Sequence, residues 1–236
     1  MRRHDVRIYS RLQRAMNEYH LHGKPISSLM TEMNLVSAIW FAWTGVLPSE
    51  AEGNILNACF VGCIDHGAEP PSARVTRVIA SCGKPLADAV AAGILAFGPR
   101  HGNAASAASV LVREAVASGR SASDVARAAI EEKRRLPGFG HPEYEVDPRT
   151  TKLGEILKAN LPSTKHFDFA QEISRELTAQ KGKPLPLNID GAIGAVLADL
   201  GASSDLADAI FLVARSVGLV MHAREEMGQS ESYRRG

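Results

Sequence analysis

The chain has 236 residues, of which 27 are Lys or Arg and 26 are Asp or Glu, so its formal net charge is +1 at pH 7. That length can bury a large core in one or two domains. The balanced charge provides no broad positive field, so we expect no nucleic acid and no anionic membrane as a partner. The start of the chain is charged and unlike a signal peptide, and no run looks long and apolar enough to span a bilayer, so we expect a cytoplasmic protein.

The three cysteines, Cys59, Cys63 and Cys82, form no CxxC pair, which is the usual spacing of a zinc site or a redox motif. We interpret them as small apolar side chains in a reducing compartment. We therefore expect no metal site.

Apolar residues recur at spacings of three and four along most of the chain, whereas period-two alternation is almost absent, which predicts an all-α fold. We expect a first helix over residues 5–20, a second from Ser27 or Ser28 to the turn at 45–48, and a third opened by Ser49 that ends at Cys63. The later helices are predicted over residues 72–81, 86–97, 104–118, 122–135, 150–159, 166–180, 191–200 and 204–227.

Three polar, glycine-framed segments interrupt these helices at residues 98–102 (GPRHG), 137–141 (PGFGH) and 188–191 (NIDG). Residues 102–200, which they bracket, are the natural candidate for a small domain. We therefore predict a large domain formed by residues 1–101 and 201–236.

Each break contains one titratable side chain, namely His101, His141 or Asp190. Two imidazoles and a carboxylate can perform proton transfer, whereas a metal site or a hydrolytic triad would need an HExxH or GxSxG pattern that the chain lacks. What remains is acid–base chemistry at a carbonyl, with arginines available to bind carboxylates or phosphates. These arginines are Arg74, Arg77, Arg100, Arg149 and Arg215.

In their order along the chain these segments resemble the citrate synthase family, in particular its short citryl-CoA lyases and the lyase module of ATP citrate lyase. The family has a Gly-Pro-x-His-Gly segment, matched by residues 98–102, and an Asn-Val/Ile-Asp segment, matched by residues 188–190. Between them it has Gly-Phe/Tyr-Gly-His followed by Asp-Pro-Arg, matched by residues 138–149. Weaker matches at 45–49, 65–67 and 212–225 extend the resemblance to about residues 20–236.

The resemblance implies a large helical domain and a small helical domain that closes over a cleft. It also implies formation or cleavage of the carbon–carbon bond between acetyl-CoA and oxaloacetate or a similar 2-oxo acid. The coenzyme A thioester (acetyl-CoA or citryl-CoA) would be a substrate, and no cofactor would be bound permanently. We expect a homodimer or a higher homo-oligomer, because the family completes its cleft across a two-fold interface.

Residue by residue, the resemblance makes Asp190 the base that removes the methyl proton of acetyl-CoA. His101 would donate a hydrogen bond to the enol oxygen, and His141 would polarise and protonate the carbonyl of the oxo acid, taking the hydroxyl proton back in cleavage. The residues alone leave alternatives: Asp190 could be a structural carboxylate that caps a helix through Gly191, and the two histidines could be ordinary structural groups.

The resemblance assigns carboxylate binding to Arg149 and Arg215 and a further substrate contact to His66, and it sends Arg235 into a neighbouring subunit's site. The alternative for each arginine is a solvated helix charge. Backbone of Pro137, Gly138, Phe139 and Gly140 would hold the adenine end of CoA, although a simple connecting turn explains the same residues.

Three departures bear on the activity. Asn103 replaces a common glycine, Pro142 follows His141 in place of Arg or Ala, and Gly191 with Ala192 follows Asp190. The last point and the short length favour a citryl-CoA lyase over a citrate synthase-type acyltransferase. A degenerate member that only binds CoA, or an unrelated helical interaction module, stays open.

Overall fold

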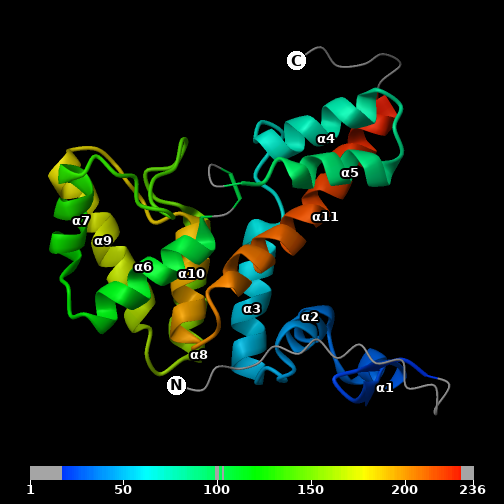
Figure 1. The fold of residues 1–236 in the computed structure, drawn as a ribbon, viewed down its shortest axis with the longest axis horizontal. Helices are drawn as coiled ribbons and strands as arrows, with labels where there is room; N and C mark the ends of the chain where they lie inside the picture. Colours follow the sequence, from blue (N-terminus) through cyan, green and yellow to red (C-terminus); the bar gives the residue numbers. More distant parts are fainter. Residues whose placement is uncertain (1–17, 99–100, 103, 230–236) are drawn as a thin grey trace. The chain divides into compact units, whose positions relative to one another are not determined.

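The computed structural model describes residues 18–98, 101–102 and 104–229. This part of the chain forms eleven α-helices and one short hairpin (Figure 1), so the predicted all-α class is confirmed. The helices are, in chain order, α1 (Ile26–Glu32), α2 (Leu35–Thr44), α3 (Glu50–Cys63), α4 (Pro71–Ser81), α5 (Leu86–Leu95), α6 (Ala105–Ala117), α7 (Ala122–Glu131), α8 (Pro148–Asn160), α9 (Lys165–Lys181), α10 (Ile189–Asp199) and α11 (Asp205–Gln229).

Local sequence sets most helix ends. α3 begins with a capping box, in which the Glu52 N–H donates to Ser49 Oγ at 3.2 Å and the Ser49 N–H donates to Glu52 Oε2 at 2.7 Å. α2 and α9 end at Gly45 and Gly182, whose φ angles of 71° and 64° are left-handed values that glycine adopts at little cost.

The N-terminal region differs from the prediction. The helix expected over residues 5–20 lies mostly outside the described residues, and at its end His20–Leu21 (β1) instead pairs antiparallel with Lys24–Pro25 (β2). The helix expected between Ser27 and residue 45 is two helices, because Asn34 caps α2 by accepting from the Ser37 N–H at 2.9 Å.

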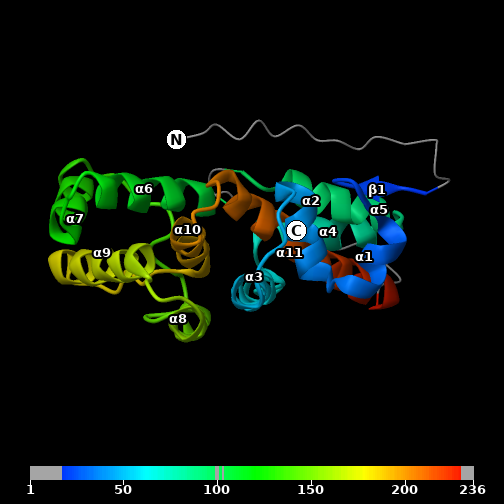
Figure 2. The same cartoon turned by 90° about the horizontal axis from the view of Figure 1, so that it is seen from below.

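Contacts divide the chain into two compact units, one up to Asn57 and one from Ala58, and α3 spans that boundary. In the second unit α4 packs against α5 and α11, whereas α10 packs against α6 and α9, and α7 against α9 (Figures 1 and 2). The long helix α11 contacts members of both groups, since it also touches α6 and α10. The proposed division into 1–101 with 201–236, and 102–200, stays a prediction.

Glycines allow the helices of the second unit to approach closely. A Cβ at Gly93 of α5 would collide with Thr76 of α4, and one at Gly194 of α10 would collide with the Ala105 carbonyl at the start of α6. Small residues at these positions therefore set the spacing between helices that carry the site.

Two expectations about apolar residues need correction. Cys59 and Cys63 are buried, but Cys82 is exposed at the end of α4, so a core role is wrong for it. α11 is long and apolar enough, by length and composition alone, to cross a membrane, although no such run was expected; half of that apolar window is buried within the protein. Arg215, His222 and Glu226 are also buried on α11, where each has a hydrogen-bonding partner from another segment, namely the Cys63 carbonyl, Asp65 and Arg77 respectively.

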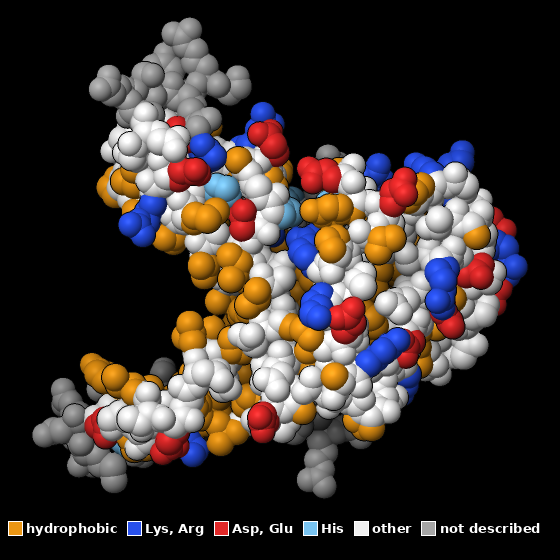
Figure 3. Space-filling model, turned by 180° about the vertical axis from the view of Figure 1, so that it is seen from behind, with side chains coloured by type: hydrophobic (Ala, Val, Ile, Leu, Met, Phe, Trp, Pro, Cys, Tyr) orange, Lys and Arg blue, Asp and Glu red, His pale blue; other side chains and the backbone are white. Residues whose placement is uncertain are grey.

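The surface of the second unit agrees with the balanced composition. On the face in Figure 3, acidic and basic side chains alternate over helices α6 to α10 without a large patch of one sign.

Candidate active site

His101 lies in a loop that closes on itself before α6. The Gly98 N–H donates to the His101 carbonyl at 2.7 Å, and the His101 N–H donates to the Gly98 carbonyl at 2.9 Å. The ring contacts the start of α4, where Nε2 lies 2.9 Å from Ser72 Oγ and accepts from the Ser72 N–H at 3.4 Å. Because Nε2 accepts there, neutral His101 carries its proton on Nδ1. Burial, followed by the nearby charge of Arg215, lowers the pKa of His101 and so favours this neutral form.

Arg215 is a buried cation, with 1% of its surface exposed. Its Nε donates to the Cys63 carbonyl at 3.0 Å, its Nη1 lies 3.1 Å from His66 Nδ1, and its guanidinium lies 4.7 Å from the centre of the Phe211 ring. Within the described residues its buried Nη2 has no hydrogen-bond partner and no carboxylate forms an ion pair with it. A buried guanidinium without a counter-ion is costly, and an incoming carboxylate would supply the missing partner.

His66 is neutral beside this cation. Burial, followed by the charges of Arg215, Arg149 and His101, lowers the pKa of His66 to about 3. Arg215 can only donate, and its Nη1 lies nearer to Nδ1 (3.1 Å) than to Nε2 (3.5 Å), so we assign Nδ1 as the acceptor and place the ring proton on Nε2. The His66 and His101 rings are stacked with centroids 6.3 Å apart. Two neutral rings therefore face the same region.

The segment that carries His66 is fixed on α11. A Cβ at Gly218 would collide with the Ile64 carbonyl, so the segment lies directly on the helix. Asp65 then accepts from His222 Nε2 at 2.8 Å and from the Gly67 N–H at 3.0 Å. Gly67 adopts a φ of 97°, which favours glycine at this turn.

His141 is held by its own turn. Its Nδ1 accepts from the Glu143 N–H at 3.1 Å and from the Tyr144 N–H at 3.2 Å. Its Nε2 lies 3.5 Å from Nη2 of Arg149. Because Nδ1 accepts two N–H groups, the proton of the neutral ring is on Nε2, and two donors then face each other with no acceptor between them. A carbonyl oxygen bound here would accept from both.

Arg149 is not the solvated helix charge of the alternative interpretation. Its Nε and Nη2 donate to the two carboxylate oxygens of Asp147 at 3.0 and 2.8 Å, and the side chain of Asp147 is fully buried. Burial alone would raise the pKa of Asp147, but the hydrogen bonds and charge of Arg149 outweigh it and lower that pKa. Asp147 also caps α8 through the Arg149 N–H at 3.0 Å. The pair therefore holds Arg149 in one orientation beside His141.

Asp190 lies in the first turn of α10. The cap of this helix is Asn188, whose Oδ1 accepts from the Gly191 N–H at 3.1 Å, so the capping role considered for Asp190 is taken by another residue. Asp190 Oδ1 is buried and has no hydrogen-bond partner among the described residues. Burial raises the pKa of Asp190 to about 6, although the charges of Arg215 and Arg149 oppose the shift. Asp190 as a whole is half-buried, and a carboxylate with one buried, unpartnered oxygen and a pKa of about 6 suits a general base.

Backbone pairing joins the His141 segment to the Asp190 helix. The Gly140 N–H donates to the Pro186 carbonyl at 2.7 Å, and the Asn188 N–H donates to the Gly138 carbonyl at 3.0 Å. The side chain of Asn188 adds a bond to the Gly140 carbonyl at 3.0 Å. Gly138 (φ 84°) lies against Gly191, and a Cβ on either glycine would collide with the other residue. Glycine is therefore required on both sides of this contact.

The structure thus brings six of the predicted site residues into one electrostatic cluster. Arg215 and Arg149 act on the pKa of both Asp190 and His66, and His141 lies next to Arg149. Arg235, Arg100 and Asn103 lie outside the described residues. The four residues expected to hold adenine, residues 137–140, belong to the segment that pairs with residues 186–188. In that pairing the Gly140 N–H and the Gly138 and Gly140 carbonyls already form hydrogen bonds within the protein. Binding of CoA by this segment stays a prediction.

Sequence reasoning gave no role to Ser72, Asp147 and Asn188, which orient the predicted residues. Asp147 and Asn188 each precede a helix, so the N-cap preference of Asp and Asn could have indicated them. Ser72 is 29 positions from His101, and local sequence carries no sign of that contact.

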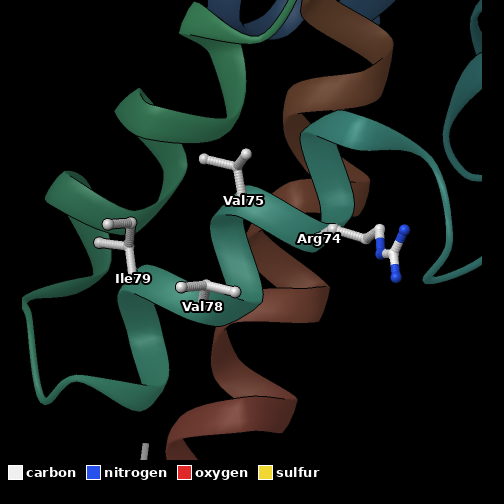
Figure 4. Close-up of a pocket in the computed structure, with 4 residues that line it drawn as sticks. All are labelled: Arg74, Val75, Val78 and Ile79. Atoms are coloured by element: carbon white, nitrogen blue, oxygen red, sulfur yellow. The ribbon is translucent and has the colours of Figure 1, made fainter. Parts of the chain in front are cut away.

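Other candidate sites hold none of this chemistry. A hollow of about 390 Å³ on α4 is lined by Val75, Val78 and Ile79, with Arg74 pointing away from them (Figure 4). Within the described ranges no three His, Cys, Asp or Glu side chains form a group suited to a metal ion. The polar cluster is therefore the candidate active site.

Comparisons with known proteins agree on one family. The family model "Citrate synthase, C-terminal domain" matches residues 4–235. A probable ATP-citrate synthase of Dictyostelium discoideum is 30% identical over 231 residues, which are 89% of this chain and 36% of that protein. ATP-citrate synthase beta chain protein 1 of Arabidopsis thaliana is 28% identical over 86% of this chain and 36% of its own length. The chain thus spans about a third of these curated relatives.

Solved structures share the fold. Citryl-CoA lyase from Hydrogenobacter thermophilus is 38% identical with a TM-score of 0.84, covering 92% of this chain and 84% of its own. ATP citrate lyase from Methanosaeta concilii, in complex with (3S)-citryl-CoA, is 25% identical with a TM-score of 0.85, covering 95% of this chain and 39% of its own. Citrate synthase from Thermotoga maritima, at 23% identity and a TM-score of 0.70, shows the fold alone.

The helical fold carries a cluster of histidines, arginines and one carboxylate with a buried oxygen, which are the groups that acid–base chemistry at a carbonyl uses. The chain belongs to the citrate synthase family, as the match over residues 4–235 shows, and it is similar to citryl-CoA lyase and to the citrate synthase-like part of ATP citrate lyase.

Proposed function

We propose that the chain acts as a citryl-CoA lyase, which interconverts citryl-CoA with acetyl-CoA and oxaloacetate. The observation that carries this proposal is the unpartnered, buried Oδ1 of Asp190 within the electrostatic influence of the buried Arg215, which forms no direct ion pair among the described residues. A base of pKa about 6 and a cation without a counter-ion are what a CoA thioester with a carboxylate-bearing partner would need.

In the synthetic direction Asp190 removes a methyl proton of acetyl-CoA. The negative charge then develops on the thioester oxygen, to which His101 presents its Nδ1–H. The carbon attacks the carbonyl of the oxo acid, whose oxygen faces His141 and Arg149, and Arg215 holds a carboxylate. In cleavage the electron pair of the carbon–carbon bond returns to the thioester enolate, and protonated Asp190 gives its proton to the carbon. The hydroxyl proton passes to solvent water beside His141.

The backbone of Pro137, Gly138, Phe139 and Gly140 remains our proposal for the adenine end of CoA. Phe139 is the central residue of the pair with Leu187, so its own N–H and carbonyl point away from residues 186–188. We also propose a homodimer, with Arg235 reaching the neighbouring site, and a cytoplasmic location.

The test incubates the purified chain with (3S)-citryl-CoA, and separately with acetyl-CoA and oxaloacetate, while acetyl-CoA and free thiol are followed. Cleavage of citryl-CoA without thiol release supports a lyase. Rapid thiol release from acetyl-CoA and oxaloacetate would instead indicate a citrate synthase-type acyltransferase. Binding of CoA without turnover in either direction would refute the enzymatic role and leave a CoA-binding homologue.

A further inference from the structure

The turn that follows His141 determines which of its ring nitrogens holds the proton. Nδ1 accepts the N–H groups of Glu143 and Tyr144 at 3.1 and 3.2 Å, two and three residues further along the chain. The contact of Nε2 with Arg149 is longer, at 3.5 Å. Since a neutral imidazole has one N–H and one acceptor, the two shorter contacts place the proton on Nε2.

Two residues of this turn, Pro142 and Tyr144, are placed to influence the ring. Pro142 fixes φ at the first turn position and has no N–H that could compete for Nδ1. The Tyr144 ring lies 4.5 Å from the His141 ring, tilted by 34°. Residues 142–146 are exposed, so burial does not hold the turn. The hydrogen bonds, the proline and the ring contact must hold it instead.

We propose that Pro142 and Tyr144 are positioning residues that lock His141 as an Nε2–H donor, so that His141 stabilises charge on the substrate oxygen and is not the base for the hydroxyl proton. A ring whose Nδ1 accepts two amides and whose Nε2 carries hydrogen has no free lone pair for that proton. The proton passes to solvent water, which reaches the half-buried ring. The identity of the oxygen rests on the proposed function, whereas the state of the ring does not.

The first experiment measures the ring without substrate. In protein labelled with ¹⁵N in its histidines, the His141 signals are assigned by their loss in His141→Gln, and the nitrogen shifts are read at pH 8. We expect an unprotonated Nδ1 and a protonated Nε2 in the native chain, and mixed tautomers in Tyr144→Ala and Pro142→Ala. An Nδ1–H ring, or freely exchanging tautomers in the native chain, would overturn the proposal whether or not the chain cleaves citryl-CoA.

The second experiment measures catalysis. Tyr144→Ala should lower kcat for citryl-CoA cleavage about tenfold, the effect of one weakened hydrogen bond to a charged group, and should leave methyl-proton exchange of acetyl-CoA unchanged. Tyr144→Phe keeps the ring and should restore most of the rate, and Val146→Ala, at an exposed position of the same loop, serves as the control. An equal loss in Tyr144→Phe, or a loss that appears only in KM, would contradict the positioning role.

Discussion

Two of the three histidines of the site, His141 and His101, are held in different ways. His141 is oriented by amides two and three residues away, on an exposed turn, whereas His101 is oriented by Ser72, which is 29 residues away at the start of α4. Both arrangements occupy one ring nitrogen as an acceptor and leave an N–H for the substrate. A local turn and a tertiary contact thus both leave a neutral ring with one N–H donor, but different substitutions would disrupt each of them.

The arginines show a matching contrast. Arg149, on the His141 side, is neutralised by Asp147, whereas Arg215, beside His66, has no carboxylate partner among the described residues. We infer that Arg215 supplies most of the electrostatic attraction for substrate, and that Arg149 mainly contributes a fixed direction.

Asp190 is influenced by the charges of both Arg215 and Arg149 and is the proposed base, so its replacement should have the largest effect on turnover. Asp190→Asn is nearly isosteric and should preserve CoA affinity while it lowers turnover by about 10²–10⁴, as expected for the loss of a general base. Steady-state kinetics and calorimetry with CoA check both expectations. Undiminished turnover would contradict the mechanism.

The same variant should be more stable than the native chain at neutral pH. The folded pKa of Asp190, about 6, exceeds the ordinary aspartate value of 3.8. The favourable contribution of the protonated group is therefore complete below pH 3.8 and is lost as the pH rises through 6. This difference corresponds to about 2–3 kcal/mol at pH 7. Denaturant melts should show a stability gain of Asp190→Asn at pH 7.5 that largely disappears at pH 4.

Arg215→Leu should reduce kcat/KM by about 10²–10³, mainly through KM, because it removes the cation that lacks a counter-ion. Asp147→Asn tests the other side. It removes the negative charge and one of the two oxygens that accept from Arg149, so KM should change less than in Arg215→Leu, and kcat should fall as the orientation of Arg149 is loosened. Equal changes in KM in the two variants would contradict the assignment of substrate attraction to Arg215 and of orientation to Arg149.

The pH dependence of kcat/KM should follow Asp190. The base must be ionised in the free enzyme, so the rate should be flat above pH 6 and fall about tenfold per unit below it. His66, with a pKa of about 3, stays neutral throughout this range. A profile without an acidic limb near pH 6 would exclude Asp190 as the titrating base.

Ser72→Ala should have the smallest effect. It removes the Oγ contact with His101 but keeps the Ser72 N–H, so the rate of methyl-proton exchange should fall only about five- to tenfold. Ser81→Ala, a second buried serine of α4, is the control. If Ser72→Ala slowed carbonyl chemistry but not exchange, the assignment of His101 to the thioester oxygen would be wrong.

Much of the fold could be predicted from the sequence because glycine, proline and capping residues mark helix ends locally. Ser49 with Glu52 and the glycine-framed breaks were identified in this way. The break at Asn34 was missed, because apolar spacing continues from Leu29 to Trp40 and only the cap shows where the chain leaves the helix.

For the site, sequence identified the residues but not what surrounds them. That Arg215 lacks a counter-ion, or that Asp190 Oδ1 lacks a partner, depends on how α3, α10 and α11 pack. Local sequence describes only neighbours along the chain. The turn of His141 is the exception, because all of its groups lie within residues 141–144.

The most direct test of the central claim is exchange of the acetyl-CoA methyl protons in deuterated solvent, followed by NMR. We predict exchange with the native chain, its loss in Asp190→Asn, a slower rate in His101→Ala, and a nearly unchanged rate in His141→Ala, whose contact is with the other substrate. Exchange that persists in Asp190→Asn, or that depends on His141 more than on His101, would contradict the assignment of Asp190 as the base and of His101 as the donor to the enolate.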